Sequence, residues 1–515
     1  MQKFKRISAI ITTAFLLLSL AVPAAAAPLT GTVTMKDTAG ATKTSSVYEA
    51  HRVVTWNASK VGSEVLYTDM ALNFLYKQAI VDTLGAPLTA GSADAEVLKA
   101  LSAVTDAAKM EALGVALSEV THTADATATA GVFTALPYGY YLIRETENNA
   151  NDGTVLSKPI LVSVPDKDTG AADVSVTVKT SKANVTKDIL RGEGASVTTA
   201  KSADVKIGDT VKFQLTASVP TYAANATGIH YYLTDTLSAG LTLDQSSVVV
   251  MADGKLLTAA DYTVTVTGGN VLKIDFTYAN IKNAKLLTAT YSAVLNEKAT
   301  LGATGNPNSV TLTYTNNPGT GKPYTTPEQH TVVYTTAINL TKVGGAQEKL
   351  AGAEFEIYSD AACTTPVKFY SYKVVTDETG THVTTELEKN IAGKIITDKD
   401  GVASFVGLIA GDYYIKETKA PAGYDLLKQV IPVKISVQLP TSITTGKEQA
   451  TWKVIGDQFI ENSGVFAGEI VNTKGFRLPG TGGMGTTIFV ICGVSLLVLA
   501  GGLFFVYSRK NRAKS

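Results

Sequence analysis

A lysine, a glutamate and an asparagine in the C-terminal part of the chain carry side chains that could react with one another. Lys342 lies in "INLTKVGG", Glu417 in "GDYYIKETKAPAGYD" and Asn472 in "GEIVNTKG". A lysine in a dry core loses its proton readily and becomes a nucleophile. Its attack on an asparagine amide would release ammonia and leave an isopeptide bond, provided that a nearby acid moves the protons.

The alternation of apolar and polar residues predicts that these three residues lie on β-strands. Tyr413, Ile415 and Glu417 fall on one face of their strand, so Glu417 is expected to point into the core. Lys342 and Asn472 lie on the first and last predicted strands of one unit, which can be neighbours in an immunoglobulin-like sandwich. The alternatives for Glu417 are that it caps a backbone group or emerges at the strand end.

The whole chain is predicted to be all-β, built of tandem Ig-like sandwich domains. Its 515 residues contain 45 basic and 45 acidic side chains, so no charge excess points to a nucleic-acid partner. Short alternating runs separated by Gly, Asn and Pro recur throughout. The exception is residues 92–120, where helical spacing follows an acidic start and predicts a helical insertion, with a further helix over 69–83.

An internal repeat indicates the number of domains. "GVFTALPYGYYLIRETE" at 131–147 matches "GVASFVGLIAGDYYIKETK" at 401–419, which implies two related domains separated by a third without the repeat. We therefore predict three domains, over 28–181, 182–336 and 337–476.

Both ends of the chain carry export signals. Residues 1–27 combine basic residues, an apolar run and a small-residue end, which is typical of a secretory signal peptide. Residues 486–507 form an apolar run long enough to span a bilayer, and the basic tail over 508–515 is expected to stay in the cytoplasm. Nearly the whole chain is therefore expected outside the cell.

Taken together, these motifs resemble the SpaA-type backbone pilins of Gram-positive bacteria. The resemblance rests on the signal peptide, the Cna-like domains, the "YYIKETKAPAGY" E-box and the LPXTG-type motif Leu478-Pro479-Gly480-Thr481-Gly482. In that family a Lys/Glu/Asn triad forms an isopeptide bond spontaneously. The resemblance implies that Lys342 and Asn472 are joined in this way and that Glu417 is the promoting acid.

The middle domain resembles the CnaA-type variant, in which an aspartate can replace the glutamate. This resemblance implies Lys187 in "NVTKDI" as the nucleophile and Asp235 in "HYYLTDTLSAGL" as the acid. Asn316 in "TLTYTNNPG" is the expected amide, and Asn317 and Asn308 remain alternatives.

The first domain, of CnaB type, keeps the acid as Glu145 but is expected to form no internal bond. Aligning "VSVTVKT" with "GEIVNTK" so that Lys179 takes the position of Asn472 leaves no amide there, and Lys36 is then expected to stay unlinked. "DVSVTVK" also has the layout of the family's pilin motif, with Lys179 as its lysine. Lys182 is the alternative.

The resemblance implies that a pilus-specific sortase cuts between Thr481 and Gly482 and joins Thr481 to the pilin-motif lysine of the next copy. Only "TKGFR" separates Asn472 from Leu478, and this short tether favours a shaft subunit over a protein anchored singly to peptidoglycan. The expected partners are the sortase, further copies of the chain, minor pilins and peptidoglycan, at the cell wall and in a surface pilus. The alternative is a wall-anchored adhesin or minor pilin that binds host matrix.

No enzyme activity beyond single-turnover self-crosslinking, and no metal or cofactor, is expected. "TDKDG" at 397–401 lacks the rest of a calcium-loop pattern and is read as a β-turn. The histidines have no metal-ligand spacing, and no phosphate loop or nucleophile elbow occurs.

Overall fold

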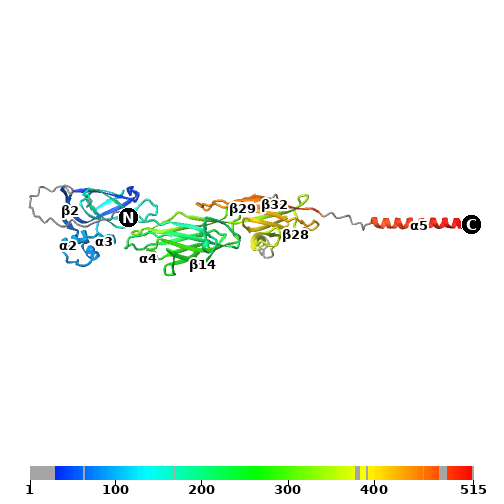
Figure 1. Ribbon diagram of the computed structural model, residues 1–515, viewed down its shortest axis with the longest axis horizontal. Coiled ribbons are helices and arrows are strands. Elements are labelled where there is room, and N and C mark those ends of the chain that lie inside the picture. The colour runs from blue at the N-terminus through cyan, green and yellow to red at the C-terminus, as the bar shows by residue number, and fades with distance from the viewer. Residues whose placement is uncertain are drawn as a thin grey trace, which may run out of the picture. The chain divides into compact units, whose positions relative to one another are not determined.

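The computed structural model describes residues 29–61, 64–167, 169–376, 383–389, 393–455, 458–474 and 484–512 (Figure 1). The predicted signal peptide, 1–27, and the sorting motif, 478–482, lie outside these residues. The chain divides into two compact units. Unit 1 contains the residues up to Thr335 together with Gln438–Thr451, and unit 2 contains Thr336–Val437 and the residues from Trp452 onward.

The first part of unit 1 is a β-sandwich with a helical insertion. Strands β5-β1-β8 form one sheet, and β3-β2-β6-β7, with β4 beside β2, form the other. Its elements are β1 (Thr30–Lys36), β2 (Ser46–Val61), β3 (Glu64–Leu72), α1 (Phe74–Leu84), α2 (Asp94–Ser102), α3 (Ala107–Ser118), β4 (Ala126–Ala128), β5 (Val132–Pro137), β6 (Gly139–Asn148), β7 (Ile160–Val164) and β8 (Asp173–Thr177).

The helical insertion differs from the sequence prediction in two places. The predicted helix over 92–120 is two helices, because Asp106 accepts a hydrogen bond from the backbone N–H of Lys109 and begins α3 anew. The predicted helix over 69–83 begins only at Phe74, since β3 runs on to Leu72. Figure 1 shows α2 and α3 beneath β2, and their buried residues form a second core with β2 and β6.

The second part of unit 1 is a larger sandwich. One sheet has the order β10-β9-β12-β18-β14-β15, and the other β11-β21-β19-β13-β17-β16 with β20 beside β19. Its elements are β9 (Val185–Arg191), η1 (Gly194–Ser196), β10 (Thr198–Ala200), β11 (Ser202–Asp204), β12 (Thr210–Ser218), β13 (Tyr231–Leu237), β14 (Leu241–Ala252), β15 (Lys255–Leu256), β16 (Tyr262–Thr267), β17 (Val271–Phe276), α4 (Tyr278–Ile281), β18 (Leu286–Leu295), β19 (Asn306–Asn317), β20 (Lys322–Thr325) and β21 (Gln329–Tyr334).

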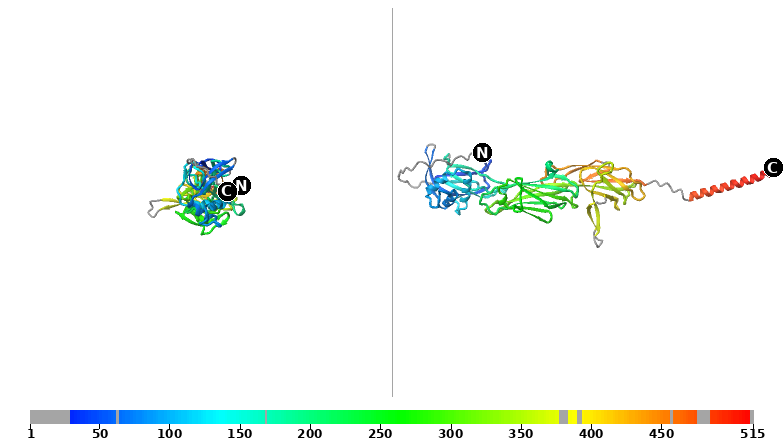
Figure 2. Two further views of the ribbon diagram at one scale, coloured as in Figure 1. Left: turned by 90° about the vertical axis from the view of Figure 1, so that its left-hand side faces the viewer. Right: turned by 60° about the horizontal axis from the view of Figure 1, so that its bottom comes forward.

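Unit 2 holds the third sandwich. Its sheets have the orders β25-β24-β27-β22-β32-β31 and β26-β23-β28-β29-β30, and Figure 2 shows the β24–β25 hairpin extending away from them. The elements are β22 (Thr336–Gly344), β23 (Glu354–Tyr358), β24 (Tyr370–Thr376), β25 (Val383–Lys389), β26 (Lys394–Ile396), β27 (Val402–Leu408), β28 (Gly411–Lys419), β29 (Ile431–Gln438), β30 (Thr451–Ile455), β31 (Phe459–Asn462) and β32 (Val465–Asn472). The all-β fold class is confirmed.

A last helix, α5 (Met484–Arg512), contains the stretch predicted to span a membrane. Among the described residues, no helix meets the length and apolarity needed to cross a bilayer. The span over 486–507 and the tail over 508–515 therefore stay predictions.

Candidate isopeptide sites

The third sandwich brings Lys342, Glu417 and Asn472 together in its core. Their exposed fractions are 0%, 1% and 2%. Lys342 lies on β22 and Asn472 on β32, and these two strands pair in parallel, with Lys342 opposite Ile470. Glu417 reaches them from β28 in the facing sheet, with Tyr413 and Ile415 buried on the same face. The prediction that Glu417 points inward is confirmed.

The three side chains contact one another directly. Lys342 Nζ donates to Asn472 Oδ1 over 2.5 Å and lies 3.4 Å from Glu417 Oε1. Asn472 Nδ2 donates to Glu417 Oε1 over 3.0 Å and to Oε2 over 3.1 Å. Glu417 Oε2 also accepts the backbone N–H of Leu427 over 2.6 Å, so the carboxyl group caps the backbone as well as facing the amide.

This arrangement can transfer a proton from the amine to the amide nitrogen. Glu417 Oε1 lies within reach of both Lys342 Nζ and Asn472 Nδ2, so it can take a proton from one and give it to the other. Burial lowers the pKa of Lys342, and the nearby Glu417 only partly offsets this effect. A larger fraction of Lys342 is therefore the neutral amine that attacks a carbonyl carbon.

A glycine fixes where Lys342 lies. Gly401 accepts the backbone N–H of Lys342 over 2.7 Å and has a φ of +74°. A Cβ at this position would lie 2.6 Å from the Lys342 carbonyl oxygen, so only glycine lets the two backbones approach. The equivalent glycine of the repeat, Gly131, holds Met35 in the same way, over 2.8 Å.

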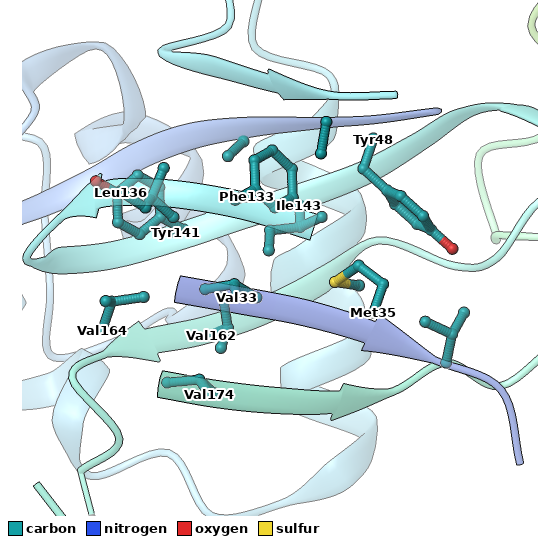
Figure 3. Packing of buried hydrophobic residues seen from close by; sticks show 13 residues of the cluster. Val33, Met35, Tyr48, Phe133, Leu136, Tyr141, Ile143, Val162, Val164 and Val174 are labelled. Atoms are coloured by element: carbon teal, nitrogen blue, oxygen red, sulfur yellow. The ribbon is translucent and has the colours of Figure 1, made fainter. Parts of the chain in front are cut away.

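This equivalence identifies the missing partners in the first domain. Met35 occupies the position of Lys342, and because Met35 pairs with Val176 as Lys342 pairs with Ile470, Val178 occupies the position of Asn472. Both Met35 and Val178 are fully buried, and Figure 3 shows Met35 in the core near Tyr48. The alignment that placed Lys179 opposite Asn472 is thus wrong by one residue.

The lysines predicted near this position lie elsewhere. Lys36 is half-buried, and its carbonyl oxygen accepts the backbone N–H of Val178 over 2.7 Å. Lys179 and Lys182 are both exposed, in the segment that follows β8.

Glu145 keeps the backbone-capping contact without the reactive pair. Its Oε2 accepts the N–H of Ser157 over 2.7 Å, as Glu417 accepts that of Leu427. Its Oε1 lies 3.7 Å from Nζ of Lys43, a residue outside the triad positions. Burial and the negative charge of Glu145 raise the pKa of the adjacent Tyr48.

We predict that Glu145→Ala destabilises the first domain without changing its covalent chemistry. The substitution leaves the part-buried N–H of Ser157 without its partner, and the loss of such a hydrogen bond costs about 1 kcal/mol. Thermal or denaturant unfolding of the purified chain measures this loss. Glu147→Ala is the matched control, because Glu147 is exposed on the same strand. Equal stability of both variants would contradict the capping role.

The middle domain holds a different cluster. Lys187 Nζ contacts Asp235 Oδ2 and donates to the Tyr291 hydroxyl over 2.9 Å. Tyr291 donates to Asp235 Oδ1 over 2.8 Å and accepts from Asn308 Nδ2 over 2.8 Å. Lys187, Asp235 and Asn308 are 0% exposed and Tyr291 is 2% exposed.

The predicted amide, Asn316, is not part of this cluster. Asn308 and Asn316 are eight positions apart on β19, which at about 3.3 Å per residue separates them by about 26 Å. Asn316 accepts the backbone N–H of Leu156 through its carbonyl oxygen, and the Asn317 side chain bonds Thr146, Gly319 and Thr320. The structure therefore corrects the choice of amide to Asn308, which the sequence left as an alternative.

The sequence missed Tyr291 altogether. It lies on β18 in "TATYSAVL", a run whose alternation predicts a buried strand residue and nothing more. Burial lowers the pKa of Lys187 and raises that of Asp235, so the uncharged forms of both are favoured. The phenol ring of Tyr291 stacks on Phe213 with 5.4 Å between ring centroids.

The lysine and the asparagine lie on the same sheet in one cluster and on different sheets in the other. Lys342 and Asn472 are on neighbouring strands of one sheet, β22 and β32. Lys187 is on β9 of one sheet, whereas Asn308 is on β19 of the other. A Lys187–Asn308 bond would staple the two sheets together.

Comparisons with known proteins agree with this architecture. A model described as a SpaA prealbumin-like fold domain matches residues 336–449, and one described as the Gram-positive pilin backbone subunit 2, Cna-B-like domain, matches residues 207–318.

Two curated proteins are similar over most of the chain. The trypsin-resistant surface T6 protein of Streptococcus pyogenes serotype M6 is 24% identical over 406 residues, covering 64% of this chain and 70% of that protein. The fimbrial subunit type 2 of Actinomyces naeslundii is 25% identical over 429 residues, covering 74% and 72%.

Among solved structures, the T6 backbone pilin of serotype M6 Streptococcus pyogenes shares the fold. It aligns with a TM-score of 0.51 and 18% identity, covering 88% of this chain and 100% of that structure. The chain thus contains one region that matches a SpaA prealbumin-like fold domain and one that matches a Gram-positive pilin backbone domain, and it shares its fold with the T6 backbone pilin.

Proposed function

We propose that this protein is the shaft subunit of a covalently polymerised surface pilus, stabilised by two self-formed Lys–Asn isopeptide bonds. The observation that carries the proposal is that two separate domains each bury a lysine, an acid and an asparagine in one hydrogen-bonded cluster, with direct contacts in the third domain and contacts through Tyr291 in the middle domain. Burying such groups is costly unless they are paired or react.

The proposed reaction in the third domain balances without any added reagent. Lys342 Nζ attacks Cγ of Asn472, the new C–N bond forms, and the bond from Cγ to Nδ2 breaks. A proton passes from Nζ through Glu417 to Nδ2, which leaves as ammonia. Lys187 and Asn308 would react in the same overall sense in the middle domain.

Such bonds would change how a domain responds to load. A sandwich held only by packing fails under tension at its unfolding rate. A bond between Lys342 and Asn472 would carry force between the first and last strands of the third domain. One relative is named for its resistance to trypsin, which is what we expect of domains that do not unfold locally.

Polymerisation is proposed to use the predicted sorting motif and an exposed lysine. Sortase would cut between Thr481 and Gly482 and transfer Thr481 to Lys179 of another copy, with Lys182 as the alternative. Minor pilins and peptidoglycan are the further proposed partners, and the cell wall is the proposed site of anchoring.

A wall digest of cells that express the protein tests the shaft role. The digest is separated in boiling SDS and probed for this chain. We expect a ladder of high-mass species, because each added copy is joined by an amide bond. A single band would instead favour the alternative, a singly anchored adhesin that binds host matrix.

We predict that Asn308→Ala prevents the middle-domain bond, whereas Asn316→Ala leaves it intact. Only Asn308 lies beside the Tyr291 hydroxyl, within the cluster that holds Lys187. Peptide mapping of the two purified variants reads out the result. A Lys187 crosslink that survives in the Asn308 variant and is lost in the Asn316 variant would contradict the choice of Asn308.

A further inference from the structure

The middle-domain cluster contains a hydroxyl group, and the third-domain cluster described above contains none. In the third domain, the described hydrogen-bond partners of the Lys342, Glu417 and Asn472 side chains are one another and the N–H of Leu427. The aromatic ring near the lysine there is Phe355, 5.8 Å from Nζ, which has no hydroxyl group. The middle domain has Tyr291 instead.

The acid and the amide of the middle domain are connected only through this hydroxyl. Among the described residues, Asp235 makes no hydrogen bond to Asn308, and the Tyr291 oxygen is the hydrogen-bond partner of Asn308 Nδ2. An aspartate side chain is one methylene shorter than a glutamate. Glu417 therefore reaches its amide directly, whereas Asp235 reaches its own through Tyr291.

Resting on the isopeptide chemistry proposed above, we infer that Tyr291 is a catalytic residue that relays a proton from Lys187 Nζ to Asn308 Nδ2. Its oxygen lies 2.9 Å from Nζ and 2.8 Å from Nδ2, so it touches both the attacking and the leaving nitrogen.

The protons balance through the cluster. Lys187 first gives one proton to Asp235, which leaves a neutral amine and a neutral acid. As Nζ bonds to Cγ of Asn308, a second Nζ proton passes to the Tyr291 oxygen while the phenol proton passes to Nδ2. The bond from Cγ to Nδ2 breaks, ammonia leaves, and Tyr291 ends as a neutral phenol.

The surroundings of Tyr291 suit this role. Burial raises the pKa of Tyr291 well above its ordinary value, so the phenol gives up its proton only while it receives another. Stacking on Phe213 holds the ring, and Lys187 Nζ lies 5.0 Å from the Phe213 centroid. The hydroxyl is thereby fixed between the two nitrogens.

Tyr291→Phe in the full chain tests the relay, because it removes the hydroxyl and keeps the stacked ring. We expect the Lys187–Asn308 bond to form at least ~10²-fold more slowly, the range of general acid–base catalysis. Peptide mapping measures the linked fraction over time. The Lys342–Asn472 bond in the same molecule should form as in the wild type.

Tyr231→Phe is the matched control, since Tyr231 is equally buried in the same domain and donates to the Ser218 carbonyl oxygen over 2.8 Å. We expect both bonds in this variant. A Lys187–Asn308 bond that forms at the wild-type rate in Tyr291→Phe would overturn the relay.

The double variant Tyr291→Phe/Asp235→Glu separates catalysis from folding. Its longer acid should contact Asn308 as Glu417 contacts Asn472, so we expect the bond to return. If Tyr291→Phe unfolds the middle domain and the double variant also stays unlinked, the relay is rejected in favour of a structural role. Absence of the Lys187–Asn308 bond in the wild type would instead reject the isopeptide proposal itself.

Discussion

Glu417→Ala is expected to leave Lys342 and Asn472 unlinked, so that the mass of the purified chain falls short of its own sequence mass by one ammonia molecule fewer than that of the wild type does. The reason is geometric, because Glu417 is the acid that contacts both reacting nitrogens. Intact-mass spectrometry of the two proteins, prepared in parallel, measures the difference.

The same substitution should also lower the stability of the third domain strongly. An unreacted Lys342 would remain buried without its acid, and a buried amine that lacks a compensating partner destabilises the fold. Loss of the covalent bond adds to this cost. Unfolding of the variant should therefore begin in the third domain, at a lower temperature than in the wild type.

Glu145→Ala is the matched control for the mass measurement. Glu145 caps a backbone N–H as Glu417 does, but Met35 and Val178 replace the reactive pair around it. We expect the mass deficit of this variant, relative to its own sequence mass, to equal that of the wild type. A smaller deficit in Glu145→Ala, or an unchanged deficit in Glu417→Ala, would contradict the assigned roles.

Lys179→Ala is expected to abolish the ladder of polymers on the cell surface and leave single subunits. Lys179 is exposed in the segment that follows β8, where a sortase-bound Thr481 of another copy could reach its amine. Without that amine, the only outlets for the proposed thioester are the wall precursor and water. Wall digestion followed by electrophoresis in SDS reads out the polymers.

Lys182→Ala controls for the loss of a neighbouring exposed lysine. We expect a normal ladder in this variant. A ladder that persists in Lys179→Ala and disappears in Lys182→Ala would move the acceptor to Lys182. Persistence in both variants would place the acceptor outside this segment.

The sequence could predict the third-domain cluster because local patterns carry it. Strand alternation puts Glu417 on the buried face with Tyr413 and Ile415, and the flanking strands have recognisable lysine and asparagine positions. The helical insertion was also predictable from its spacing. The break before α3 depends on a single capping side chain, Asp106. The spacing of apolar residues does not show where such a cap divides a helix.

The sequence could not choose the middle-domain amide, because the choice depends on register. Asn308 and Asn316 are both on β19, and the pairing of Asp235 with Val310 decides which of them lies near the acid. Spacing alone left Asn316, Asn317 and Asn308 as alternatives. Lys187 and Asn308 lie on different sheets of the sandwich, β9 and β19. The assignment of strands to sheets cannot be read from the sequence around either residue.

In the first domain, too, the strand register could not be predicted from the sequence, and the alignment was wrong by one residue. The sequence around Lys179 can be aligned with the sequence around Asn472 in more than one register. The pairing of β1 with β8 shows that Val178 occupies the position of Asn472. Met35 and Val178 replace the lysine and the asparagine, so Glu145 has no reaction partners in this core. Glu145 still accepts the backbone N–H of Ser157.

Peptide mapping of the purified wild-type chain tests the central claim most directly. We predict two crosslinked peptide pairs, one joining Lys342 to Asn472 and one joining Lys187 to Asn308, each lighter than its parts by one ammonia. Recovery of unmodified peptides that contain Lys342, Asn472, Lys187 and Asn308 would contradict it.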